Sequence, residues 1–220
     1  MQTSASGFKQ VYEKYISLEN ARDDIRETLH SLDSEKFPMG ANSASVGELG
    51  IKLMESTNKN AISQVYCTQC DYAEIEYSDQ LGYIFNIEKS KAYSTQKWLD
   101  SLEIPCRDKC NECFSKLTHQ IDYKEKPDLL LLEYPHTNIK SSHKIKLKVN
   151  DEYKVLSLRG IIYHGGNHFS SRIISSDGTI WYNDGIETGK NSIEDGHLST
   201  ISYEDLKFCK GKNLVLVVYA

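Results

Sequence analysis

Residues 155–184 read VLSLRGIIYHGGNHFSSRIISSDGTIWYND, and the organisation of the chain can be worked out from this stretch. Ser176-Asp177-Gly178 separates two runs of β-forming residues, 168–175 and 179–183. An Asp-Gly pair between such runs is typical of a tight hairpin turn. The run 155–164 is also rich in aliphatic and aromatic residues. We therefore expect three neighbouring antiparallel strands in this part of the chain.

The flanking segments extend this β-rich region in both directions. Residues 144–149 alternate lysine with Ile145, Leu147 and Val149, which predicts a strand with one buried face. The apolar run 129–132 predicts a fully buried strand, and 214–219 predicts another at the C-terminal end. Most of the last 95 residues are thus expected to form one antiparallel sheet.

The first half of the chain shows a different pattern. Apolar residues recur at helical spacing over 8–32, and a second helix is expected over 45–55. Residues 65–76 and 82–87 contain β-formers, and Ser94 is a candidate N-cap for a short helix over 95–102. Helices followed by a mainly antiparallel sheet predict the α+β fold class.

Composition excludes several classes of protein. The chain has 39% hydrophobic and 26% charged residues and a net charge of −5, without a long block of Lys or Arg, so we expect no nucleic-acid partner. No apolar run approaches the roughly 20 residues of a membrane span. Met1–Gly7 does not resemble a secretory signal, so we expect an intracellular, reducing location, where cysteines serve as thiols or metal ligands.

Four of the six cysteines form two Cys-x-x-Cys pairs, Cys67 with Cys70 and Cys110 with Cys113. Two such pairs supply the four thiolates of a tetrahedral zinc site. A closed site of this kind has no open position for a substrate, so we expect structural zinc. Cys106 with Cys110 is a rival pair, which leaves the ligand set open at this point.

A histidine and two possible partners stand at corresponding ends of the expected hairpin. His168 begins one strand, and Asn183 and Asp184 end the other. If the strands pair across the turn, one of these side chains meets the imidazole. A carboxylate or carboxamide that orients a histidine is what a general base in nucleophilic catalysis requires. A purely structural His–Asp contact has the same pattern, and geometry alone does not separate the two readings.

The same segments resemble the histidine box and zinc fingers of ubiquitin-specific proteases. The likeness runs from about Ala21 to Ala220 and is strongest over Val155–Ile186. It rests on Tyr153-Lys154-Val155-Leu156, Ile161–Tyr163, His164-Gly165-Gly166, Asn167-His168-Phe169 and Trp181-Tyr182-Asn183-Asp184, with the two Cys-x-x-Cys pairs upstream.

This resemblance implies a papain-like cysteine-protease fold. Residues 8–60 would be part of a helical thumb, 65–125 the zinc fingers and 126–220 the β-rich palm. It further implies that the chain binds ubiquitin or a ubiquitinated protein, and we expect it to do so as a monomer. In the family, a cysteine thiolate attacks the isopeptide carbonyl. His168 would be its base, and Asp184 or Asn183 would orient that base.

The sequence also departs from the family pattern. Asn167 and Phe169 replace the glycine and tyrosine that flank the family's histidine, and no cysteine precedes Cys67, so the nucleophile is not recognisable. Cys209 follows apolar residues and is expected to be a buried core residue. We therefore expect the chain to be inactive by itself. Two alternatives are a non-catalytic ubiquitin-binding module and a zinc-stabilised interaction domain unrelated to ubiquitin.

Overall fold

The computed structural model describes residues 18–39, 49–50, 61–78, 82–84, 94–100, 104–134, 140–189 and 191–220. The chain divides into two compact units, Met1–Thr57 and Asn58–Ala220. The described helices are α2 (Leu18–Leu32), α4 (Thr95–Asp100) and α5 (Tyr203–Lys207). The described strands are β1 (Ala61–Cys67), β2 (Ala73–Ser78), β3 (Gly82–Ile84), β4 (Ile104–Lys109), β5 (Lys116–Tyr123), β6 (Leu130–Glu133), β7 (Lys144–Val149), β8 (Glu152–Gly165), β9 (His168–Ile174), β10 (Thr179–Asn183), β11 (Ile193–His197), β12 (Phe208–Cys209) and β13 (Lys212–Tyr219).

The first unit contains helix α2, which matches the second half of the helix expected over 8–32. Leu29 is buried, and His30 Nδ1 lies 3.0 Å from the carbonyl oxygen of Phe37, where the chain turns back after the helix. The helix expected over 45–55 lies outside the described residues except for 49–50, which are helical. None of the helices that the structure describes is long and apolar enough to cross a membrane.

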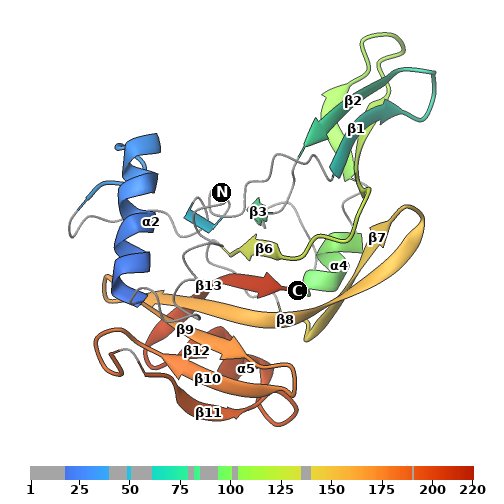
Figure 1. Ribbon diagram of the computed structural model, residues 1–220. Helices are drawn as coiled ribbons and strands as arrows, with labels where there is room; N and C mark the ends of the chain where they lie inside the picture. The colour runs from blue at the N-terminus through green and yellow to red at the C-terminus, as the bar shows by residue number, and fades with distance from the viewer. Residues whose placement is uncertain are drawn as a thin grey trace. The chain divides into compact units, whose positions relative to one another are not determined.

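Strand β8 organises the second unit because different parts of its length pair with different neighbours (Figure 1). Its first part pairs with β7, from Glu152 opposite Val149 to Ser157 opposite Lys144. Its second part pairs with β9 and, on the other edge, with β13. The sheet order is β11-β10-β9-β8-β7-β5-β1-β2, with β13 also joining β6 and β12.

The core of this unit is formed largely by buried side chains of strands β6 to β10 and β13. The expected alternation of β7 is confirmed, since Ile145, Leu147 and Val149 are buried and the lysines between them are exposed. Two fully buried tyrosines donate hydrogen bonds to backbone carbonyls, Tyr163 to Leu206 and Tyr219 to Ser142, both at 2.9 Å. Burying a tyrosine is favourable only when its hydroxyl is bonded in this way.

Most of the expected strands and turns are confirmed, with some shifts in their boundaries. Ser94 caps α4 by accepting a hydrogen bond from the amide of Lys97, and Trp98 and Leu99 are buried. Leu129 was expected in the buried strand, but it precedes β6 and is 37% exposed, so that expectation was wrong. The preceding Pro127 and the late start of β6 leave Leu129 outside the ladder.

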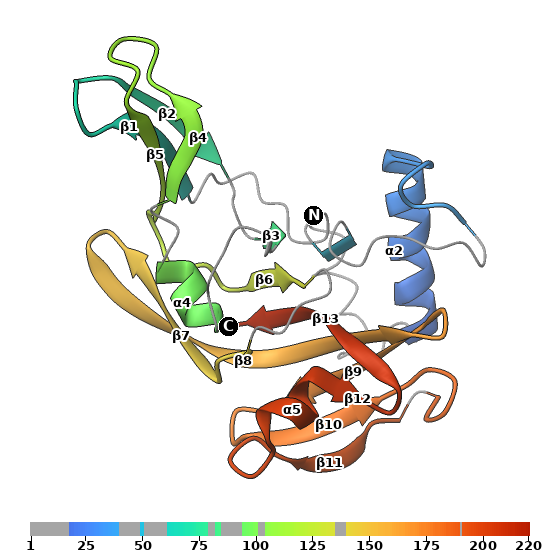
Figure 2. The same ribbon diagram turned by 180° about the vertical axis from the view of Figure 1, so that it is seen from behind.

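A four-stranded finger extends the sheet beyond β7. It consists of β1, β2, β4 and β5, with β1 between β2 and β5 (Figure 2). The β1–β5 pairing aligns Ala61 with Tyr123 at one end and Cys67 with Leu117 at the other. Tyr123 in turn pairs with Val149 of β7, which joins the finger to the rest of the sheet. The whole is a sheet-dominated α+β structure, as the sequence predicted.

Candidate active site and metal centre

The β8–β9 hairpin places His168 at the first position of β9. Gly165 pairs with His168, and Gly166 and Asn167 form the two-residue loop between them. Both loop residues have a φ of +60°, the positive φ that a tight type I′ turn requires. Asparagine tolerates this conformation better than other non-glycine residues. Asn167 is therefore compatible with this turn.

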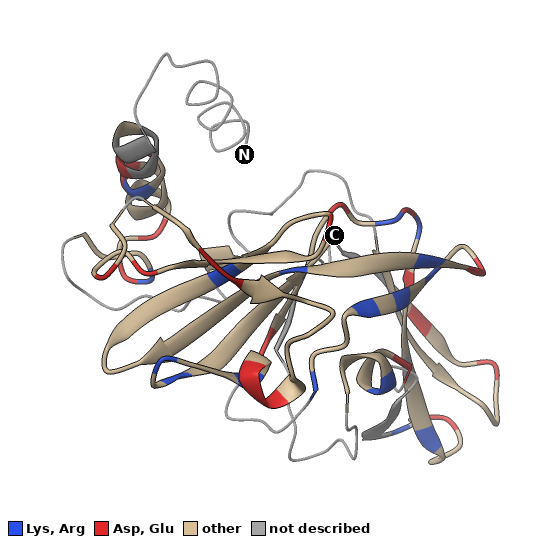
Figure 3. Cartoon of the chain, turned by 90° about the horizontal axis from the view of Figure 1, so that it is seen from below, with Lys and Arg blue, Asp and Glu red and all other residues tan. Residues whose placement is uncertain are grey.

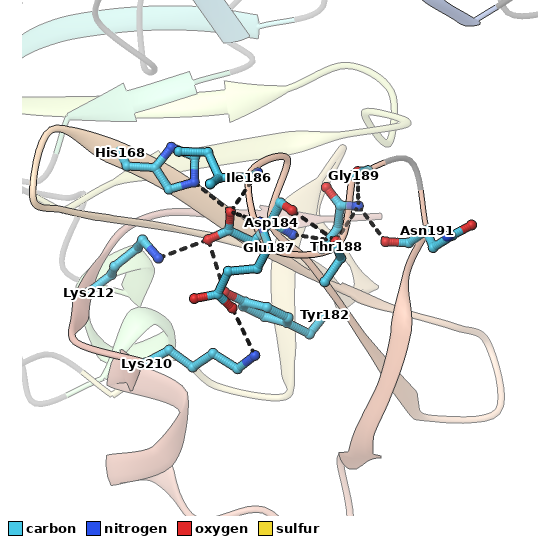
Figure 4. Close-up of polar contacts among 11 residues, drawn as sticks. His168, Tyr182, Asp184, Ile186, Glu187, Thr188, Gly189, Asn191, Lys210 and Lys212 are labelled. Carbon is cyan, nitrogen blue, oxygen red and sulfur yellow. Dashed lines mark hydrogen bonds and ion pairs between the residues drawn. The ribbon is translucent and has the colours of Figure 1, made fainter.

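Asp184 meets His168 directly across the sheet. In the β9–β10 ladder Asn183 pairs with Ser171, so Asp184 leaves β10 beside the start of β9. His168 Nε2 lies 2.6 Å from Asp184 Oδ1 (Figure 4). The Nδ1 atom of His168 has no partner among the described residues, and the side chain is 28% exposed. One ring nitrogen is thus held by the carboxylate, and the other remains accessible.

The Asp184 carboxylate is 1% exposed and is held by the turn that follows it. Oδ1 also accepts hydrogen bonds from the backbone amides of Ile186 at 2.9 Å and Glu187 at 3.2 Å. Thr188 closes the turn, because its hydroxyl accepts from the Asp184 amide and its own amide donates to the Asp184 carbonyl. These bonds fix the direction in which the carboxylate faces His168.

The second oxygen of Asp184 contacts a buried lysine. Oδ2 lies 2.9 Å from Lys212 Nζ and accepts a hydrogen bond from the Tyr182 hydroxyl at 3.1 Å. Burial alone would raise the pKa of Asp184, but Lys212, His168 and the backbone amides together lower it well below its ordinary value. The carboxyl group is therefore ionised at neutral pH. Its two oxygens contact different side chains, Oδ1 that of His168 and Oδ2 that of Lys212.

Lys212 was not identified from the sequence. It looks like an ordinary lysine before an apolar strand, yet its side chain is only 10% exposed. The Asp184 carboxylate raises the pKa of Lys212, which stays charged. Gly165 makes room for it, because a Cβ there would lie 3.1 Å from the Lys212 Cα and 3.0 Å from the Gly211 carbonyl oxygen. Glycine is thus favoured at position 165 because a larger residue would clash with Gly211 and Lys212.

Asn183, the other candidate partner of the histidine, holds a loop instead. Its side-chain amide donates to the carbonyl of Asn191 at 2.8 Å and also lies within 3.4 Å of Thr188 Oγ1 and the Gly189 carbonyl. Neighbouring residues of a strand point to opposite faces, so only one of the two residues can reach the ring. In this structure that residue is Asp184.

Cys209 lies in the core, as expected from the sequence. It is 3% exposed and packs within the main hydrophobic cluster. Burial raises the pKa of its thiol, so the thiolate is disfavoured. The structure thus gives no reason to treat Cys209 as a nucleophile.

The four Cys-x-x-Cys sulfurs form one cluster at the end of the finger. Cys67 Sγ lies 3.4 Å from Cys113 Sγ, and Cys70 Sγ lies 3.5 Å from Cys110 Sγ. All four sulfurs lie within 4.8 Å of one another. These distances are too long for disulfide bonds. They are close to the separation of about 3.8 Å that four thiolates have around one ion at 2.3 Å.

Backbone hydrogen bonds shape both cysteine turns. The amide of Cys67 donates to the Tyr72 carbonyl at 3.0 Å, and that of Cys110 donates to the Ser115 carbonyl at 2.8 Å. The long gap between the two pairs is bridged by the β1–β5 ladder, which puts Cys67 opposite Leu117. The rival ligand Cys106 belongs to β4, and its side chain lies outside the described residues.

The donor set fits a soft or borderline metal ion, of which zinc is the commonest in proteins. Hydrogen bonds from the side chain and backbone of Ser115 lower the pKa of Cys113 to about 6, which favours the thiolate form that a metal ion binds. Two of the sulfurs, those of Cys67 and Cys110, belong to buried residues. Such a cluster would bind the metal as part of the fold.

Comparison with known proteins identifies the fold but not a family. No protein-family model matches the chain. No curated protein matches it either. A solved structure of the yeast SAGA DUBm with an Sgf73 mutant contains a chain that is similar to this one, with a TM-score of 0.50 and 17% sequence identity. The match covers 92% of this chain and 49% of that chain.

Other solved structures of the SAGA DUB module are similar at a lower level. The Ubp8/Sgf11/Sus1/Sgf73 module bound to monoubiquitin gives a TM-score of 0.48 at 16% identity. The module bound to ubiquitin aldehyde gives 0.47 at 18%. Each comparison covers 73% of this chain and 40% of the other. The chain therefore spans less than half the length of the structures it matches, and it shares its fold with a chain of the yeast DUB module.

Proposed function

We propose that this chain is a partial ubiquitin-specific protease-type domain of papain-like fold, with part of the thumb, the finger and the palm. His168 would act as the general base, and Asp184 would orient it. The observation that carries this proposal is the contact of 2.6 Å between His168 Nε2 and Asp184 Oδ1, which leaves Nδ1 accessible to a thiol. The similarity in fold to a chain of the yeast DUB module supports the same reading.

In this proposal the imidazole would take the proton of an attacking thiol and later give it to the leaving amine. Asp184 would hold the ring in the orientation and tautomer that this transfer needs. Lys212 and the turn amides would keep the carboxylate ionised and fixed while the ring changes charge. The nucleophile has no candidate in the described residues, since four cysteines form the finger cluster and Cys209 is in the core.

The finger would hold one structural zinc ion through Cys67, Cys70, Cys110 and Cys113. The proposed division is a thumb part over 8–60, a finger insertion over 65–125 and a palm over 126–220. We further propose ubiquitin or a ubiquitinated protein as the partner. The expected monomeric state and intracellular location stay predictions.

A fluorogenic assay tests the catalytic half of this proposal. We expect no turnover when the chain is incubated with ubiquitin that carries a C-terminal fluorophore. Turnover that persists after Cys209→Ala would contradict the absence of a nucleophile from this part of the chain. Loss of turnover on that substitution would instead identify Cys209 as reactive.

A binding experiment separates the proposal from the alternative of an interaction domain unrelated to ubiquitin. ¹⁵N-labelled ubiquitin titrated with the zinc-loaded chain should show saturable chemical-shift changes. The same titration with His168→Ala should give similar binding, because the histidine would serve chemistry. Absence of shifts at millimolar concentrations would favour a zinc-stabilised interaction domain unrelated to ubiquitin.

A non-catalytic ubiquitin-binding module is the second candidate. It is favoured by one observation, that within the described residues no cysteine sulfur makes a hydrogen bond with His168. Ubiquitin binding together with no turnover is the outcome expected for it. A fusion of the chain with a cysteine-bearing helix from a ubiquitin-specific protease then distinguishes this module from the protease part. Turnover that depends on His168 and Asp184 favours the protease part over the module.

A further inference from the structure

A second polar site lies at the opposite end of the β8–β9 pairing from His168. It is an open hollow of about 350 Å³ between the middle of β8, the β9–β10 turn and the end of β11. The pairing runs from Gly165 opposite His168 to Gly160 opposite Ile173, and the hollow begins where it ends. All of the residues that line the hollow belong to the described part of the second unit.

The strand register brings two cations to one side of this hollow. Lys144 pairs with Ser157, and Arg159 follows two residues later on β8, so it shares a face with Ser157. Within the described residues, neither cation lies within ion-pair distance of a carboxylate. Figure 3 colours the Lys and Arg positions of the chain blue and the Asp and Glu positions red. Arg159 uses one N–H to bond the Ser175 carbonyl at 2.8 Å, which leaves further guanidinium donors for a ligand.

The opposite wall is a turn that a histidine holds in place. His197 Nε2 donates to the Asp177 carbonyl at 2.8 Å, so Nε2 carries the proton and Nδ1 accepts from the Ser199 amide at 3.2 Å. Gly178 has a φ of +97°, and a Cβ there would lie 2.8 Å from His197 Nε2. The turn is therefore preformed, which reduces the entropy cost of binding a ligand against it.

Two further groups in the hollow define its chemistry. The Asp177 carboxylate, the acid among the lining residues, is engaged by the Thr179 amide at 3.0 Å and so stays within the turn. His143 Nε2 is buried without a hydrogen-bond partner in the described residues, and burial lowers the pKa of the ring. Because this nitrogen is shielded from solvent, His143 contributes packing to the wall of the hollow and no hydrogen-bond donor to a ligand.

We propose that this hollow binds a phosphate monoester group. Arg159 and Lys144 would supply the positive charge, and Ser157 and Ser176 would supply hydroxyl donors. A dianion with three acceptor oxygens matches two cations and several donors better than a carboxylate does. The hollow is larger than a phosphate, so it has room for the carrier, either a phosphorylated side chain of a partner protein or a small phosphorylated molecule.

A titration at constant ionic strength tests the proposal with three probes. These are inorganic phosphate, N-acetyl-phosphoserine amide and glycerol 3-phosphate, each added to the zinc-loaded ¹⁵N-labelled chain. We expect saturable shifts at the amides of Ser157, Arg159 and Ser176 with millimolar affinity. Tighter binding of phosphoserine identifies a protein carrier, and tighter binding of glycerol phosphate identifies a small molecule.

Matched lysine variants make the result decisive. Lys144→Gln should weaken binding about threefold or more, because an ion pair to phosphate is lost. Lys146→Gln, at an exposed position two residues along the same strand, should leave affinity unchanged. Arg159→Gln should weaken binding about tenfold. Absence of saturable binding, or equal effects of the two lysine variants, would overturn the proposal, since equal effects indicate non-specific charge attraction.

Discussion

The finger and residues 126–220, which are called the palm from here on, are stabilised in different ways, although one sheet runs through both. The palm has a continuous core that includes the fully buried Leu132, Leu156, Ile161 and Tyr182. Among the finger side chains that the structure describes, one small cluster has three buried residues, and two of these are cysteines, Cys67 and Cys110 with Leu117. An apolar core must offset the entropy of ordering the chain, and this described cluster is small for a segment of four strands. We therefore expect the finger to depend on the proposed metal ion, whereas the palm folds around its apolar side chains.

Substituting a finger cysteine should have the largest effect. In Cys110→Ser the thiolate set is incomplete, so we expect loss of the bound metal and rapid amide exchange throughout β1 and β5. The palm amides should remain protected. Metal analysis and hydrogen exchange measure the two effects.

Cys209→Ser is the matched control for that experiment, because Cys209 is also buried but lies in the palm core. It should lower palm stability and leave the metal content unchanged. A Cys110→Ser chain that retains one metal ion per molecule would show that the four cysteines are not the ligand set, with Cys106 the next residue to test.

How much of the finger and the palm could be predicted from the sequence depends on how far apart along the chain the interacting residues lie. The alternation of β7 and the β9–β10 turn are local, and both were predicted correctly. The β1–β5 ladder joins segments far apart in sequence, and no local pattern predicts that Cys67 lies opposite Leu117. The cysteine spacing indicated the metal site without predicting the strands that assemble it.

The candidate active site shows the same division. The hairpin argument brought His168 close to both Asn183 and Asp184, but only side-chain direction distinguishes them, and the structure assigns Asp184. Lys212 was missed because its burial results from β12 and β13 folding back beside β8. A lysine before an apolar strand gives no signal that its ammonium group is buried against a carboxylate.

Asp184→Ala should have the largest effect within the palm. The substitution leaves the Lys212 ammonium group buried without its counter-ion, and breaking a buried pair costs about 3 kcal/mol of unfolding free energy. Urea denaturation of the palm, followed by tyrosine and tryptophan fluorescence, measures this loss. Asp151→Ala is the control, because its partner Lys148 lies at the surface and Asp151 is 91% exposed. Equal losses in the two variants would mean that Asp184 and Lys212 are hydrated.

The contribution of Asp184 should depend on pH in a defined direction. Its pKa is depressed in the folded chain, so the stabilisation is fully present above the unfolded value of about 3.9 and is lost as pH falls toward the folded value. The difference in unfolding free energy between the chain and Asp184→Asn should be constant from pH 7 to about pH 5. It should narrow below about pH 4. A difference that narrows already between pH 7 and pH 6 would assign the effect to another group.

The smallest effect on stability is expected from glycine substitutions in two turns with positive φ, one in the finger and one in the palm. Phe114, after Cys113, has a φ of +59° and is 73% exposed, whereas Asn167 in the His168 hairpin has a φ of +60°. Phenylalanine is strained in this conformation and asparagine much less so. Phe114→Gly should therefore raise the stability of the metal-bound finger by about 0.5 kcal/mol, after the greater entropy loss of glycine is subtracted. Asn167→Gly should change palm stability little. If Phe114→Gly instead lowered the resistance of the finger to a chelator, the exposed ring would have to be stabilising the cysteine turn through contacts of its own.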